Sequence, residues 1–249
     1  TLSRPTAAST TELLVAWQRW APHHSDRMLT AEAWIWSKGP WASSASRSWA
    51  SRPHAFLKGL YVGPKTELVR LIGSELLPLL SNATRSRVKL FTRTDASHLD
   101  QVMRLGGVKN KHELNSGEHG FDTSPPWNSW KGRSLVATVD ASERFFSLLA
   151  SGYISQSGRF ASMKGVHSYV ELKPLGGAIA ELPRNATAFA HRSARWWLLM
   201  SFFWRETDTD EAVNAICRKS AELFARLRRE LRDCCGPGGM YAGYADHSA

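Results

Sequence analysis

Residues 166–204 read VHSYVELKPLGGAIAELPRNATAFAHRSARWWLLMSFFW, and this stretch decides how the rest of the chain is arranged. At its start polar and apolar side chains alternate, which is the two-residue period of a β-strand with one polar face. The polar face comprises His167, Tyr169 and Glu171, and the other face comprises Ser168, Val170 and Leu172.

Pro174 and the pair Gly176-Gly177 end this strand, because glycine allows backbone conformations that other residues avoid. After Pro183, residues 195–204 are almost continuously apolar, which is typical of a central strand covered on both faces. A polar-faced strand joined through glycines to a buried strand predicts one wall of a ligand pocket.

Outward from this stretch, patterns of alternating or apolar residues predict four further strands, over residues 28–36, 56–62, 88–94 and 135–139. Apolar residues at helical spacing predict helices that begin near Ser9 or Thr10, at Pro64, at Asp140 and at Asp208 or Thr209. Residues 109–133 are polar and predict a long loop. Together, the predicted strands and helices indicate an α+β fold, a mainly antiparallel β-sheet with helices packed on it.

Composition narrows the class of protein. The chain has 249 residues and no linker-like segment, so one domain is expected. Its net charge is +10, but basic residues are scattered rather than clustered, so no nucleic-acid partner is predicted. No apolar run is long enough to span a bilayer, and the three cysteines form no metal-ligand pattern, so neither a membrane partner nor a metal site is expected. Asn82-Ala-Thr and Asn185-Ala-Thr have the form of glycosylation acceptors, and secreted and cytoplasmic locations both stay open.

Three motifs follow one another in a recognisable order. They are Gly176-Gly-Ala-Ile, then Asn185-Ala-Thr-Ala-Phe-Ala-His-Arg192, then Tyr241-Ala-Gly-Tyr-Ala-Asp246 after a Trp-rich strand and a long helix. With the opening helix they resemble FAD-linked oxidases of the berberine bridge enzyme type. The resemblance extends over nearly the whole of this chain. It extends over only the substrate-binding half of those enzymes. It implies that residues 1–249 are a substrate-binding domain, a fragment or split half, whose FAD is bound mainly by a flavin domain in cis or in trans. The chain alone is then expected to be inactive, and no cofactor-binding residue is predicted in it.

The resemblance implies a reaction and its catalytic residues. Such enzymes oxidise an alcohol or amine carbon by hydride transfer to flavin, while a base, often a tyrosinate, takes a proton from the substrate. Tyr244 falls at the position of this base, and Tyr241 at that of a substrate-contacting partner. Gly243 stands where the family usually has Asn, which puts the placement of the second tyrosine in doubt. Sugars, glycosides and alkaloid-like molecules are the expected substrates.

Three further residues are predicted to bind substrate. Glu171 and Tyr169 share the polar strand face, and Met200 falls near a position where many members have Gln or Glu. A solvated strand face is the alternative for Glu171, and ordinary terminal aromatics are the alternative for the tyrosines. The alternative function is a free-standing carbohydrate or aromatic-ligand binding domain that uses some of its 11 tryptophans without flavin.

Overall fold

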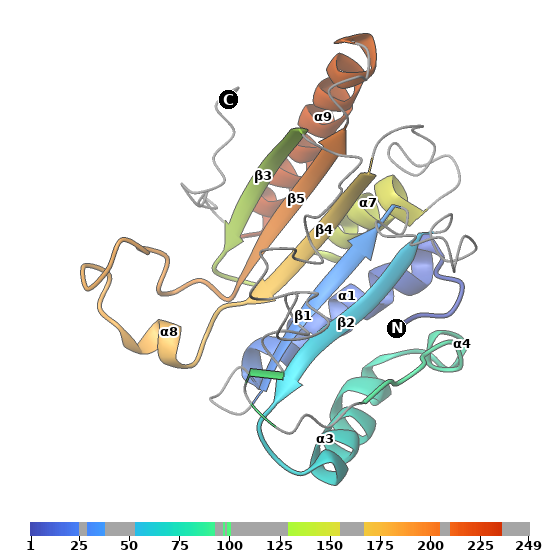
Figure 1. Ribbon diagram of the computed structural model, residues 1–249, viewed down its shortest axis with the longest axis vertical. Coiled ribbons are helices and arrows are strands. Elements are labelled where there is room, and N and C mark those ends of the chain that lie inside the picture. Colours follow the sequence, from blue (N-terminus) through green and yellow to red (C-terminus); the bar gives the residue numbers. More distant parts are fainter. Residues whose placement is uncertain are drawn as a thin grey trace.

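A five-stranded antiparallel sheet forms the centre of the computed structural model, which describes residues 1–24, 29–37, 53–92, 97, 99–100, 129–154, 167–204 and 210–235 (Figure 1). The strand order is β2-β1-β4-β5-β3. The strands are β1 (Leu29–Trp36), β2 (His54–Tyr61), β3 (Ser129–Ala137), β4 (His167–Pro174) and β5 (Trp196–Trp204). This architecture confirms the predicted α+β fold with a mainly antiparallel sheet.

Three long helices lie on one face of the sheet (Figure 1). They are α1 (Ala7–Trp20), α7 (Glu143–Ile154) and α9 (Asp210–Cys235). Shorter elements are η1 (Ala21–His23), α3 (Lys65–Leu71), η2 (Ile72–Leu76), η3 (Leu77–Leu79), α4 (Asn82–Arg85) and α8 (Ala178–Glu181). No helix within these described ranges is long and apolar enough to cross a bilayer.

The hydrophobic core lies between the sheet and the helices. Phe145 and Phe146 of α7 pack edge to face, with ring centroids 5.3 Å apart, and both rings contact Trp196 of β5. Trp17 of α1 is fully buried and donates its Nε1–H to the carbonyl oxygen of Ala31 at 2.6 Å. The indole hydrogen bond satisfies a polar group that would otherwise be costly to bury.

Two helix starts differ from the sequence prediction. Thr6, rather than Ser9 or Thr10, caps α1: its Oγ1 accepts the Ser9 N–H at 3.1 Å, and its own N–H donates to Ser9 Oγ at 2.9 Å. This reciprocal pair is a capping box with serine in the place of the usual glutamate. At α7, Ser142 Oγ accepts the Phe145 N–H at 3.1 Å.

The predicted cap of α7, Asp140, has a different partner. Its carboxylate lies 3.0 Å from the guanidinium of Arg195, the residue that precedes β5. The carboxylate therefore joins two loops at one edge of the sheet instead of capping a helix.

The predicted strand over residues 88–94 was wrong for its described part. Val88 forms a single bridge with Leu2, and residues 89–92 are not in a strand. By contrast, β3 begins six residues earlier than predicted, inside the segment 109–133 that was expected to be a loop. The pairing runs from Ser129↔Trp204 to Ala137↔Trp196, so β3 pairs with the full length of β5. This long-range pairing is not visible in the local sequence of residues 129–134.

Candidate functional site

The pairing register assigns each strand residue to one of the two faces of the sheet. Leu172 of β4 lies between Ala33 of β1 and Leu198 of β5, and all three are buried beneath the helices. Glu171 is the next residue, so it lies on the opposite face, between Trp34 and Leu199. We call this side the aromatic face; it carries Trp34, Trp36, Phe56, Tyr169 and Phe203.

Aromatic rings form a continuous row across four strands of this face. Trp34 and Phe56 are stacked with an interplanar angle of 3°, and the ring of Trp36 meets Phe56 edge to face at 5.1 Å. Tyr169 continues the row, with its ring centroid 5.2 Å from Trp34 and 5.6 Å from Phe203. Rings held by one another in this way suit a flat or ring-shaped ligand, because little side-chain freedom is lost when the ligand packs on them.

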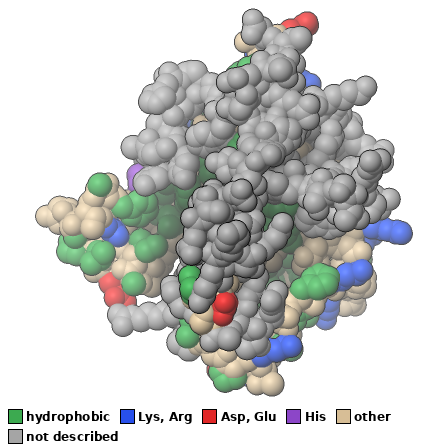
Figure 2. Space-filling model, viewed as in Figure 1, with side chains coloured by type: hydrophobic (Ala, Val, Ile, Leu, Met, Phe, Trp, Pro, Cys, Tyr) green, Lys and Arg blue, Asp and Glu red, His purple; other side chains and the backbone are tan. Residues whose placement is uncertain are grey.

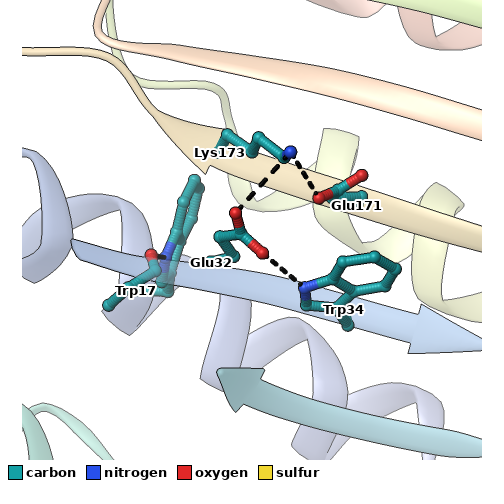
Figure 3. A network of polar contacts seen from close by, with 6 residues as sticks. Trp17, Glu32, Trp34, Glu171 and Lys173 are labelled. Carbon is teal, nitrogen blue, oxygen red and sulfur yellow. Dashed lines mark hydrogen bonds and ion pairs between the residues drawn. The ribbon is translucent and has the colours of Figure 1, made fainter. Parts of the chain in front are cut away.

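An ionic network lies beside these rings (Figure 3). Lys173 Nζ is 2.9 Å from Glu171 Oε1 and 3.6 Å from Glu32 Oε1, so it bridges two carboxylates on neighbouring strands. Trp34 Nε1 donates to Glu32 Oε2 at 3.0 Å, which ties the network to the aromatic row. The Lys173 ammonium also lies 5.4 Å from the ring centroid of Trp197, within cation–π range.

The Glu171 carboxyl is the most buried acid of this network. Only 5% of the residue is exposed. Burial raises the pKa of Glu171 above its ordinary value, while the hydrogen bond and the charge of Lys173 act in the opposite direction. A buried carboxyl held by a lysine can accept a hydrogen bond from a ligand, and such groups occur both in ion-pair networks and in active sites.

The structure brings only some of the predicted site residues together. Tyr169 and Glu171 share the aromatic face, as their alternation predicted. Met200 pairs with Val170 instead, so it lies on the helix-covered face and is fully buried in the core. Tyr241 and Tyr244 lie outside the described residues.

Three residues of the network were missed by the sequence analysis: Glu32, Trp34 and Lys173. Glu32, Trp34 and Trp36 alternate within the predicted strand over residues 28–36, and this pattern is a usable signal. Their meeting with Glu171 depends on the pairing of β1 with β4, which are far apart in the sequence.

The described residues do not form a pyrophosphate site for a dinucleotide cofactor. Such a site needs a glycine-rich turn that leads from a strand into a helix. Gly177 has a positive φ of 49° and follows β4, but the helix that it opens, α8, has only four residues. Within the same described residues no group of acidic, histidine or cysteine side chains could hold a metal ion, and Cys217 forms no disulfide.

No protein-family model and no curated protein matches the sequence. Solved structures of the same fold do exist. A BBE-like protein from Arabidopsis thaliana superposes with a TM-score of 0.67 at 18% identity, over 99% of this chain and 45% of its own. Berberine bridge enzyme from Eschscholzia californica superposes with a TM-score of 0.62 at 17% identity, over 98% of this chain and 42% of its own. A glucooligosaccharide oxidase from Acremonium strictum superposes with a TM-score of 0.62 at 15% identity, over 100% of this chain and 46% of its own.

These matches extend over essentially all of this chain, which spans less than half the length of each neighbour. At such low identities the likeness concerns the fold and agrees with the resemblance of the sequence motifs. The chain therefore has the fold of just under half of a berberine bridge enzyme-like structure.

Proposed function

We propose that this chain is the substrate-binding part of a FAD-dependent oxidoreductase that oxidises an alcohol or amine carbon of a sugar, glycoside or alkaloid-like molecule. The observation that carries the proposal is the aromatic face, on which rings in mutual contact and a buried carboxyl lie together. The neighbours support the class of substrate: one is named a glucooligosaccharide oxidase, and a berberine bridge enzyme variant was solved in complex with (S)-reticuline.

In this proposal the substrate ring packs on Trp34 and Tyr169. The Glu171 carboxyl, held in place by Lys173, accepts a hydrogen bond from a substrate hydroxyl or ammonium group. Glu32 forms an ion pair with Lys173 and accepts the hydrogen bond of the Trp34 indole, so it acts as a positioning residue. The network thus fixes both the orientation of the substrate and the position of its reacting carbon.

Proton removal is assigned to a tyrosine. The Tyr244 oxygen takes the proton of the substrate hydroxyl, and Tyr241 contacts the substrate beside it. FAD, when bound, accepts the hydride from the substrate carbon. Because the described residues offer no pyrophosphate site, the flavin is held mainly by a separate flavin domain, in cis or in trans.

The proposal is tested by comparing two samples. The protein isolated from its natural source should show the absorbance of oxidised flavin, and an anaerobic addition of its substrate should bleach that absorbance. The 249-residue chain purified alone should retain no stoichiometric FAD. A flavin-free natural protein would overturn the proposal.

The aromatic face also supports a second candidate, a carbohydrate or aromatic-ligand binding domain without flavin. It predicts that the natural protein is colourless and that it still binds glycosides through Trp34. Titration of the natural protein and of its Trp34→Ala variant with a panel of glycosides, together with the absorbance measurement, separates the two candidates.

A further inference from the structure

A pocket of about 830 Å³ lies away from the aromatic face, between β2, α1 and residues 64–80. Its floor is formed by apolar side chains that are themselves buried, namely Leu2, Leu13, Trp20, Leu29 and Leu76. Leu68 of α3 and Ile72 of η2 form the facing wall. The volume is that of a small-molecule site, and a lining of this kind favours a mainly apolar ligand at the floor.

The pocket is separate from the ionic network because β2 alternates. Lys58 directs its ammonium to the aromatic face, 5.8 Å from the Trp34 ring centroid. Leu57 and Gly59 pair with Ala33 and Ala31 and therefore belong to the helix side of the sheet, where the pocket lies. A ligand in the pocket leaves the residues of the proposed substrate site untouched.

Two exposed basic side chains are among the residues that line the pocket. Lys65 and Lys89 both line the pocket, both are exposed, and neither forms an ion pair with another described residue. Leu90 and Phe91, 49% and 77% exposed, present apolar surface beside them. Figure 2 shows the resulting mixture of hydrophobic and basic side chains around the α3 and α4 end of the molecule.

We infer that this pocket binds an unbranched aliphatic carboxylate. The alkyl chain occupies the apolar floor, and the carboxylate lies near Lys65 and Lys89, whose ammonium groups complement its charge. The Trp20 Nε1–H is buried without an acceptor among the described residues, so the floor also accepts a chain that carries a hydroxyl group.

The apolar part of the pocket is tested by measuring how affinity depends on the length of the ligand's alkyl chain. Octanoate, decanoate and dodecanoate, each below its micelle concentration, are titrated into the 249-residue chain by calorimetry. Each buried methylene should tighten the dissociation constant about fourfold, and two methylenes about 15-fold. Absence of binding, or affinity independent of chain length, overturns the inference.

Two pairs of variants locate the site. Leu68→Trp fills the pocket and should abolish decanoate binding, whereas Val69→Trp, at an exposed neighbour on the same helix that does not line the pocket, should leave it unchanged. The double variant Lys65→Glu, Lys89→Glu should weaken decanoate binding at least tenfold but leave decanol binding unchanged, and Arg70→Glu should alter neither. The charge variants keep the test decisive if Leu68→Trp does not fold. Equal decanoate binding by the double variant and Arg70→Glu contradicts the inference.

Discussion

Glu171 is the most buried acid of the proposed substrate site. Its carboxyl is buried, its ordinary pKa is 4.5, and burial raises that value against the opposing effect of Lys173. The folded protein therefore holds the Glu171 proton more tightly than the unfolded chain does. It follows that the contribution of this group to the free energy of unfolding decreases as the pH rises from about 4.5 through the raised pKa.

Glu171→Gln should remove this pH dependence. When the pH is lowered from neutral toward 4.5, the free energy of unfolding of the wild type should rise relative to that of the variant, by at most about 1.4 kcal/mol per pH unit. Urea denaturation at a series of pH values measures the difference, and the exposed Glu67→Gln serves as a control. Parallel curves for wild type and Glu171→Gln would show that the pKa is not raised.

The proposed base makes a second prediction at this scale, for the flavin-containing protein. Tyr244→Phe keeps the ring and removes the ionisable oxygen, so flavin reduction should slow by ~10²–10⁴-fold, or roughly 3–5 kcal/mol of barrier. Tyr241→Phe should slow it less. Stopped-flow absorbance under anaerobic conditions measures both rates. An unchanged rate in Tyr244→Phe would remove this residue from the mechanism and leave Glu171 as the next candidate base.

The sequence indicated the shared sheet face of some candidate residues but not that of others, for a physical reason. Tyr169 and Glu171 lie on one strand, where alternation alone fixes their common face. Met200 lies on another strand, and its face depends on whether it pairs with Val170 or with Glu171. A register shift of one residue would move it to the other face, and nothing local in the sequence sets that register.

At the scale of the elements, the strands were predicted better than their ends. Residues 28–36 and 56–62 approximate β1 and β2 because alternating patterns extend over most of each strand. The caps of α1 and α7 were misplaced because several polar residues precede each helix, and the backbone geometry decides which one caps it. The prediction of a strand over residues 88–94 was wrong for its described residues, because they pair with no neighbouring strand beyond one bridge.

The capping box of α1 gives a prediction for an element. Thr6→Ala removes the acceptor for the Ser9 N–H, so the free energy of unfolding should fall by about 1 kcal/mol. Thr66→Ala is the matched control, because Thr66 is exposed in α3, where no side-chain cap exists. Urea denaturation of both variants checks the difference. Equal stability of the two would mean that the Thr6 cap contributes nothing.

At the scale of the whole molecule, the described sheet has helices on one face and aromatic and charged side chains on the other. This division explains why the fold class was predictable while the site was only partly so. Hydrophobic periodicity reports which residues face a core, and it reports little about which polar residues from distant strands meet on the opposite face. Lys173 and Glu32 illustrate this, because their pairing needs the long-range contact of β1 with β4.

The strand order also predicts an order of folding. β1 and β2 are consecutive in the chain and pair from Leu29↔Tyr61 to Trp36↔His54, whereas β3 pairs with β5 across the intervening β4 and α7. Closing the longer loop costs more entropy, so amide protection in β3 should arise together with β5 and after the β1–β2 pair. Pulse-labelled hydrogen exchange during refolding follows each strand. Protection of β3 before β5 would contradict this order.

The same pairing matters while the protein is being synthesised. At typical translation speeds β3 leaves the ribosome roughly several seconds before the end of β5 has been made. During that interval the nascent chain carries a strand, SWKGRSLVA, whose partner does not yet exist, and such unpaired strands readily join to other chains. Chaperones that hold extended segments should therefore engage the nascent protein at the apolar end of β3, residues 135–137, and release it when β5 emerges.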